Sequence, residues 1–185
     1  SKPIGPFYLK EEADLLARTN NFVFKEDARK RGWRRVVASP EPKDILNKKV
    51  IKELVRKGNI VIAAGGGGVP VYQDKDKMLH GVEAVIDKDL ASALLAIEIE
   101  ADEFFILTDV PKVYINFNKP NQQQLDFIKV SDAKKYYEAG EFGAGSMGPK
   151  ILAAIRFVEH GGKETVITES TQLGDPNCGT RIIQD

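Results

Sequence analysis

Four consecutive glycines, Gly65–Gly68, follow directly on the apolar run Ile60–Ala64, and this is the feature that most constrains the fold. Such a run is typical of a strand buried on both faces of a parallel sheet. Ligands of parallel sheets bind beyond the carboxyl ends of the strands. Glycines there let backbone N–H groups approach an anion without a Cβ in the way. We therefore predict a buried strand and an anion-binding loop; the alternative is a flexible turn. The loop residues are Gly65, Gly66, Gly67 and Gly68.

The rest of the chain alternates between predicted helices and predicted strands. The predicted helices are Asp44 to about Lys57, Asp87 to about Ile99, Ser131 to Tyr137 and the region from near Pro149 to His160. The predicted strands after the glycines are Phe104–Thr108, Val113–Ile115, Glu164–Thr168 and Thr180–Ile183. This alternation is typical of an α/β fold with a mostly parallel sheet sandwiched by helices.

A proline-rich connector, Ser39–Pro42, is the best candidate for a domain boundary. Before it we predict an extended segment, a short helix and two short strands, which together form a small protruding subdomain. We therefore divide the chain into residues 1–40, the subdomain with its connector, and residues 41–185, a nucleotide-binding α/β domain. The subdomain elements are Ser1–Tyr8, Lys10–Arg18, Phe22–Phe24 and Arg35–Val37.

Composition argues against several classes of function. Lys+Arg and Asp+Glu are balanced at 27 each, so no global charge indicates nucleic acid, although Lys25–Arg35 holds six basic residues around Trp33. The acidic pair Glu26–Asp27 favours a solvated surface for that stretch. No apolar run approaches the roughly 20 residues of a membrane helix. One cysteine, Cys178, suits a reducing, cytoplasmic compartment. His80 and His160 show no metal spacing, so we predict no protein-bound metal site.

A second glycine-rich segment, Gly143–Lys150, has the pattern G-x-G-x-x-G. The pattern indicates dinucleotide binding only when a strand precedes it, and here a predicted helix does. We interpret it instead as a phosphate-facing loop, formed by Ser146, Met147 and Gly148, that opens the helix near Pro149. Lys150 then lies beside the helix N-terminus, where anions are favoured. The alternative for Lys150 is an ordinary solvated lysine.

Two further segments carry candidate polar groups. Val85–Asp89 places Lys88 between two aspartates at a strand-to-helix corner, where a carboxylate can hold a cation toward phosphate; the alternative is a helix cap with an exposed charge pair. Leu107–Phe117 places Thr108, Asp109 and Tyr114 near a strand end. These groups suit ribose or adenine, while the alternative is a strand–turn–strand with core aromatics.

The motifs, taken in order, resemble the carbamate kinases of the amino-acid-kinase family. They cover almost the whole chain, and the ordered set is far more specific than any one of them. They are KPIGPFY (Lys2–Tyr8), KED (Lys25–Asp27), GWRRVV-SP (Gly32–Pro40), GGGGVPV (Gly65–Val71), VEAVIDKD (Val82–Asp89), ILTDVPKVYINFNKP (Ile106–Pro120) and GSMGPK (Gly145–Lys150).

This resemblance implies an amino-acid-kinase fold and an enzyme that uses ATP/ADP with Mg²⁺. It would interconvert ADP plus carbamoyl phosphate with ATP plus carbamate, as a homodimer. By motif, Lys88 and Lys150 would contact the transferring phosphoryl group, Asp89 would orient them, and Lys2 would reach the same phosphate. The residues lining the nucleotide pocket would be Thr108, Asp109, Val110, Tyr114 and Met147.

The family also leads us to expect a phosphate loop and a carbamate-binding loop before Lys2, and this sequence contains neither. We therefore expect an N-terminal lobe that this chain lacks, and an isolated chain without turnover. Two other functions stay open: another kinase of the same family, or a catalytically silent nucleotide-binding module.

Overall fold

The computed structural model describes residues 1–143 and 145–185, and they form two compact units. Unit 1 comprises Ser1–Glu41 and Gly68–Asp87, and unit 2 comprises Pro42–Gly67 and Lys88–Asp185. The sequence predicts a division into residues 1–40 and 41–185. The compact units differ from it by grouping Gly68–Asp87 with the N-terminal part of the chain.

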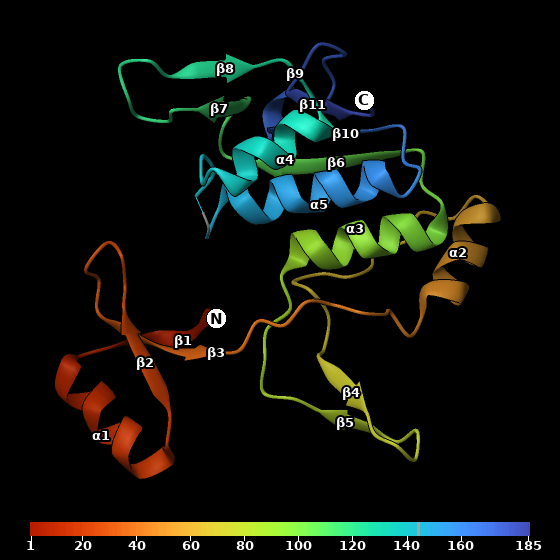
Figure 1. The fold of residues 1–185 in the computed structure, drawn as a ribbon. Helices are drawn as coiled ribbons and strands as arrows, with labels where there is room; N and C mark the ends of the chain where they lie inside the picture. The colour runs from red at the N-terminus through yellow and green to blue at the C-terminus, as the bar shows by residue number, and fades with distance from the viewer. Residues whose placement is uncertain (144) are drawn as a thin grey trace. The chain divides into compact units, whose positions relative to one another are not determined.

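Unit 1 contains a three-stranded antiparallel sheet in the order β1-β3-β2, with α1 packed on it (Figure 1). A separate hairpin, β4–β5, belongs to the same unit and was not predicted. The elements of unit 1 are β1 (Lys2–Tyr8), α1 (Lys10–Asn20), β2 (Val23–Glu26), β3 (Trp33–Val37), β4 (Val71–Gln73) and β5 (Leu79–Gly81).

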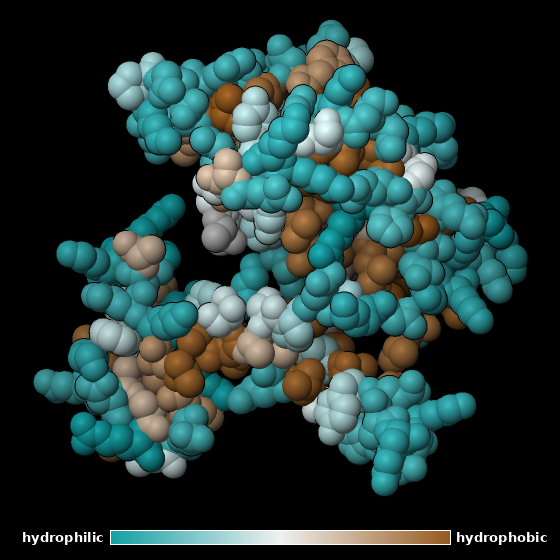
Figure 2. Space-filling view, in the orientation of Figure 1, coloured by the Kyte–Doolittle hydropathy of each residue, from teal (hydrophilic) through white to brown (hydrophobic). Residues whose placement is uncertain are grey.

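The hydrophobic core of unit 1 is small. Among its residues, all of which the structure describes, the buried apolar side chains are Ala13 and Val37. Leu15 of α1 and Val23 of β2 are exposed, and Figure 2 shows hydrophobic surface in that part of the unit. Cation–π contacts supply some of the missing packing: the Arg35 guanidinium lies 3.4 Å from the ring centre of Phe22.

Unit 2 is built on a four-stranded sheet in the order β6-β10-β11-β9. The β6–β10 and β11–β9 pairs are parallel, and the β10–β11 pair is antiparallel. A hairpin, β7–β8, follows β6. The elements of unit 2 are α2 (Lys48–Arg56), α3 (Lys88–Ile99), β6 (Glu103–Thr108), β7 (Val113–Ile115), β8 (Gln123–Leu125), β9 (Phe127–Lys129), α4 (Val130–Glu138), α5 (Met147–Glu159), β10 (Glu164–Glu169), the 3-10 turn η1 (Ser170–Gln172) and β11 (Thr180–Ile183).

One face of this sheet carries the core. α5 lies across β6, β10 and β11 and packs between α3 and α4 (Figure 1). Ile106 and Phe104 of β6 face this layer, and the Phe104 ring lies 5.5 Å from the ring of Phe157 on α5. Alternate residues of β6, Phe105 and Leu107, are exposed. The α/β class agrees with the sequence-based prediction.

The predicted strand Ile60–Ala64 is wrong. The segment has no strand pairing in the structure, and Ile60 and Ile62 are 99% and 98% exposed. A strand requires backbone hydrogen bonds to a neighbour, and no described strand pairs with this segment. The segment therefore has the apolar composition of a buried strand, but no described strand lies beside it to bury its side chains.

Several helix starts also differ from the prediction. α2 begins at Lys48 rather than after Asp44, whose carboxylate accepts a hydrogen bond from the Ile45 amide instead. α4 begins at Val130, so Ser131 lies inside its first turn rather than at its cap. α5 begins at Met147, two residues before Pro149. Element boundaries are the least reliable part of an assignment made from sequence.

Candidate phosphate-binding site

Lys150 is a buried lysine at the start of a helix. It is the fourth residue of α5 and only 7% exposed. Its Nζ donates a 3.0 Å hydrogen bond to Oδ2 of Asp89, which is 8% exposed in the first turn of α3. Because the two residues open different helices, this bond joins the N-terminus of α3 to the N-terminus of α5. The solvated-lysine alternative is therefore excluded for Lys150.

Lys88 contacts the same carboxylate. Its Nζ lies 3.3 Å from Oδ1 and 3.1 Å from Oδ2 of Asp89, while its side chain is 57% exposed. The three residues carry two positive charges and one negative charge. Both lysines lie at the starts of helices, where the N–H groups of the first turn and the helix dipole also favour an anion. Asp89 is thus placed to hold two lysines while one of them stays accessible.

Lys2 has a different partner, inside unit 1. Its Nζ donates a 2.6 Å hydrogen bond to Oδ2 of Asp87, which is 7% exposed. The sequence predicts that Asp87 caps a helix, and it gives Asp87 no role at the phosphate site. The Asp-Lys-Asp pattern of residues 87–89 was the available signal, because a buried aspartate at a corner needs a cation.

The segment after α4 forms a tight turn into α5. The amides of Ser146 and Gly148 both donate to the carbonyl of Gly143, at 3.1 and 2.9 Å. Gly148 is buried, and a Cβ there would lie 3.1 Å from that carbonyl oxygen, so the close approach favours glycine. Ala144 lies outside the described residues. Of the predicted loop residues, Ser146 precedes α5, whereas Met147 and Gly148 already belong to its first turn, ahead of Pro149 and Lys150.

The first glycine segment is arranged differently. Gly65–Gly67 form a turn in which Gly65 and Gly67 have φ of 51° and 124°. Gly68 has φ of 83° and is the first residue of the second segment of unit 1. The positive φ values explain why Gly65, Gly67 and Gly68 are glycines. The anion-binding role of this turn stays a prediction, because the strand expected to present it does not form.

The predicted nucleotide residues follow β6. Thr108 ends the strand, and its Oγ1 donates a 3.2 Å hydrogen bond to Oδ1 of Asp109. Asp109 and Val110 form a bend, and Tyr114 lies on β7, where its ring is 5.9 Å from the ring of Phe117. All four belong to unit 2, as do Lys88, Asp89 and Lys150.

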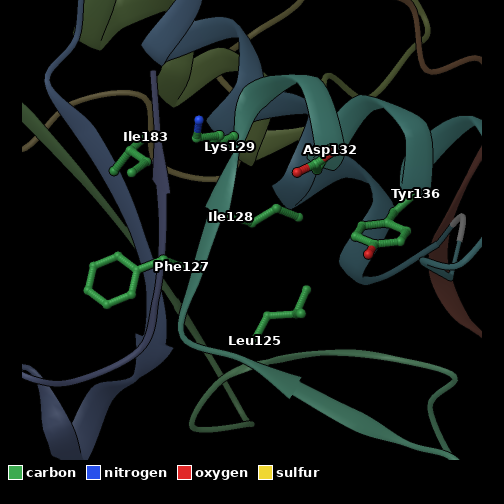
Figure 3. A pocket seen from close by; sticks show the side chains of 7 residues that line it. All are labelled: Leu125, Phe127, Ile128, Lys129, Asp132, Tyr136 and Ile183. Carbon is green, nitrogen blue, oxygen red and sulfur yellow. The ribbon is translucent and has the colours of Figure 1, made fainter. Parts of the chain in front are cut away.

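A pocket of about 310 Å³ lies elsewhere in unit 2 and contains none of the predicted site residues. Figure 3 shows Phe127 and Ile183 on one side of β9 and Ile128 and Tyr136 on the other. The lining is mostly apolar, and its acid, Asp132, pairs with Lys135 outside the lining. It lacks the convergent polar groups of a phosphate site, so the lysine cluster is the better candidate.

Residues 1–143 and 145–185 contain neither a clustered metal-ligand set nor a membrane-spanning helix. No group of three or more His, Cys, Asp or Glu side chains is arranged to hold a metal ion within that part of the chain. Among the same residues, no helix has both the length and the apolar character needed to cross a membrane.

Comparison with known proteins identifies the family. Residues 11–169 match the model of the amino acid kinase family, and the chain belongs to this family. Carbamate kinase of Thermococcus kodakarensis is 51% identical over the whole chain, and carbamate kinase 2 of Staphylococcus aureus strain RF122 is 55% identical over 98% of it. The chain spans 59% of the length of these curated relatives.

A solved structure gives the same result. The chain superposes over its full length on 59% of a carbamate kinase from Giardia lamblia bound to AMP-PNP, with a TM-score of 0.87 and 45% identity. The resemblance to carbamate kinases that the motifs indicated is confirmed.

Proposed function

We propose that this chain is the nucleotide-handling part of a carbamate kinase, which transfers a phosphoryl group between carbamate and ADP. The observation that carries the proposal is the Lys150–Asp89–Lys88 cluster, in which two lysines share one buried carboxylate at the starts of α3 and α5. The curated relatives named carbamate kinase support the choice of substrate.

The arrangement suits phosphoryl transfer. That reaction requires positioned charge more than covalent catalysis, because the transition state spreads negative charge over the equatorial phosphate oxygens. In the direction of ATP synthesis, a β-phosphate oxygen of ADP forms a bond to phosphorus while the bond from phosphorus to the carbamate oxygen breaks. We assign Lys150 and Lys88 to the transferring group, with Asp89 as the residue that orients both lysines.

The remaining assignments follow the carry-over by motif. In this proposal the nucleotide pocket is lined by Thr108, Asp109, Val110, Tyr114 and Met147, and the glycines Gly65–Gly68 contribute backbone N–H groups. Lys2 supplies a further positive charge for phosphate, and within unit 1 its ammonium is held by Asp87.

Mg²⁺, dimerisation and location complete the proposal. Mg²⁺ usually binds through substrate phosphates, waters and one or two carboxylates, so a nucleotide-borne ion fits this site. When bound, it neutralises phosphate charge. A homodimer and a cytoplasmic location are the assembly and compartment that we propose, on the resemblance and on the single cysteine.

A chimera provides the test. This chain replaces the matched 59% of the Thermococcus kodakarensis carbamate kinase, and the other 41% of the chimera is that enzyme's own sequence (100% minus 59%). We expect ATP formation from ADP, carbamoyl phosphate and Mg²⁺ in a coupled assay. A folded chimera that binds ADP but forms no ATP with carbamoyl phosphate contradicts the proposal. Turnover with a different acyl phosphate in the same assay identifies another kinase of the family.

The chain alone answers a second question. We expect it to bind ADP weakly, because the nucleotide residues of unit 2 are present, and to show no turnover, because positioning supplies much of the rate. Calorimetry with ADP and a turnover assay on one preparation measure both. Turnover within about tenfold of the intact Thermococcus kodakarensis enzyme contradicts this expectation, and binding without any turnover in the chimera supports a silent nucleotide-binding module.

A further inference from the structure

Thr180 is a buried threonine whose hydroxyl joins two strands of a hairpin. It is the first residue of β11, it is fully buried, and its Oγ1 donates a 2.5 Å hydrogen bond to the carbonyl of Leu125. The same oxygen accepts a 2.8 Å hydrogen bond from the amide of Val113. Val113 and Leu125 face each other across the β7–β8 pair. One side chain therefore fastens both strands of this hairpin to the central sheet.

The local backbone explains why Thr180 is so placed. Gly179 has φ of 73°, and a Cβ there would lie 2.6 Å from the carbonyl oxygen of Ile167 on β10. Only glycine fits this close approach, which brings the start of β11 against β10. The residue after Thr180 adds a further bond: the Arg181 amide donates a 2.9 Å hydrogen bond to the carbonyl of Asp126, which follows β8.

The hairpin carries Tyr114, the aromatic residue of the proposed nucleotide site. Val113 is fully buried and Ile115 is 8% exposed, whereas Tyr114 between them is half-buried. Because side chains alternate along a strand, anchoring Val113 and Ile115 in the core sets the direction of Tyr114. At the far end of β7, Glu141 Oε2 accepts a 3.0 Å hydrogen bond from the Asn116 amide. The strand is thus held on both sides of Tyr114.

Two other fully buried threonines of the same sheet lack this arrangement. Thr165 makes one long hydrogen bond, 3.5 Å to the Ala154 carbonyl. Thr168 is also fully buried, and its hydroxyl has no hydrogen-bond partner among the described residues. Burial alone therefore does not account for the two short bonds of Thr180.

We propose that Thr180 is a positioning residue, which holds the β7–β8 hairpin where Tyr114 contacts the nucleotide. The inference rests on the proposed function, since it assumes that Tyr114 faces an adenine nucleotide. Without the hydroxyl, a buried N–H and a buried C=O lose their partner together. The hairpin then shifts or opens toward water to satisfy them, and the ring beside Val113 moves with it.

The test uses a graded series in the 185-residue chain. Thr180→Val keeps the branched shape and removes the hydroxyl, Thr180→Cys leaves a weak S–H donor, and Thr180→Ser keeps the hydroxyl. Thr168→Val is the matched control. The measurements are thermal unfolding, the ADP Kd by calorimetry at 25 °C and hydrogen exchange of residues 113–125.

We expect Thr180→Val to raise the ADP Kd by about tenfold, the effect of losing one buried hydrogen-bonding group, and to speed exchange at Val113 by a similar factor. Thr180→Ser should stay within about threefold of wild type, and Thr168→Val should change neither quantity. If Thr180→Val fails to fold, a higher ADP Kd for Thr180→Cys than for Thr180→Ser supports the inference.

A lowered melting temperature with unchanged ADP affinity and unchanged exchange at Val113 overturns it, because that is the signature of a purely structural threonine. Equal effects of Thr180→Val and Thr168→Val on ADP affinity also overturn it. If the wild-type chain binds no ADP, the expectation of ADP binding by the chain alone fails separately, and exchange at residues 113–125 in Thr180→Val still decides whether the hydroxyl holds the hairpin.

Discussion

Two glycine-rich segments of unit 2 lie in very different surroundings. Gly143 and Gly148 enclose a turn that ends in a helix, and Gly148 is buried against the Gly143 carbonyl. The lysine that follows, Lys150, is buried and paired with Asp89. The turn Gly65–Gly67, by contrast, follows exposed isoleucines, and a Cβ on Gly65 or Gly66 would meet nothing within 4 Å.

The difference shows which kind of structure a segment can specify by itself. The backbone hydrogen bonds of a helix join residues four apart, so the turn before α5 and the helix itself are specified by residues close together in the sequence. A strand in a parallel sheet forms its backbone hydrogen bonds with strands that are distant in the sequence. Ile60–Ala64 has the composition of such a strand, but no described strand pairs with it.

The largest expected effect comes from comparing two isoleucines. Ile106→Ala removes a side chain that is 3% exposed in the core, and we expect it to lower the free energy of unfolding by about 2–5 kcal/mol. Ile62→Ala changes a side chain that is 98% exposed and should cost less than about 0.5 kcal/mol. Urea unfolding of the 185-residue chain measures both.

A cost for Ile62→Ala near that for Ile106→Ala breaks the comparison. It would mean that the Ile60–Ala64 segment is buried in solution, as a strand or at a contact between chains. Repeating the measurement at two protein concentrations separates these, because a contact between chains makes the apparent stability concentration-dependent.

Sequence reasoning succeeded where the signal was local or where a motif was specific. The strand Glu103–Thr108 and the helix Lys88–Ile99 were located to within about a residue, since apolar pattern and caps define them. The hairpin β4–β5 and the short strands β8 and β9 were missed. Each has only three residues, too few for a period to be recognised, and none consists entirely of β-branched and aromatic residues as the predicted strand Val113–Ile115 does.

The site was predictable in part, for a related reason. A lysine after a glycine-rich turn has a local signature, so Lys150 was found. Its partner Asp89 lies 61 positions away, and only the family motif linked the two. Thr180 had no local signature at all, because its role depends on two backbone groups, at Val113 and Leu125, that only the fold brings to it.

The second expected effect compares two lysines that both pair with aspartate. The Lys150 and Asp89 side chains are 9% and 10% exposed, while those of Lys112 and Asp126 are 21% and 62% exposed. In the chimera, Lys150→Ala should lower kcat/KM by about 10²-fold, the usual loss of one aimed charge in a water-poor site. Asp89 keeps Lys88, so the buried carboxylate is not left without a cation.

Lys112→Ala is the matched control, and we expect a change below about threefold, because an exposed ion pair contributes little. Lys150→Arg sharpens the result, since it keeps the charge but alters the donor geometry. Equal losses of kcat/KM for Lys150→Ala and Lys112→Ala contradict the assignment of Lys150 to the transferring phosphoryl group.

The smallest expected effect comes from placing a methyl group on each glycine segment. In Gly66→Ala the Cβ meets nothing within 4 Å, and Gly66 has no positive φ, so alanine fits without strain. Because alanine also reduces the freedom of the unfolded chain, we expect a gain of about 0.4–1 kcal/mol. In Gly148→Ala, helix propensity favours alanine by about 1 kcal/mol, but the Cβ lies 3.1 Å from the Gly143 carbonyl oxygen. That contact should cancel the gain and displace the turn before Lys150. Thermal unfolding of both variants measures the difference. If Gly148→Ala is stabilised at least as much as Gly66→Ala, the close contact with the Gly143 carbonyl does not oppose the methyl group, and the expected difference between the two turns is contradicted.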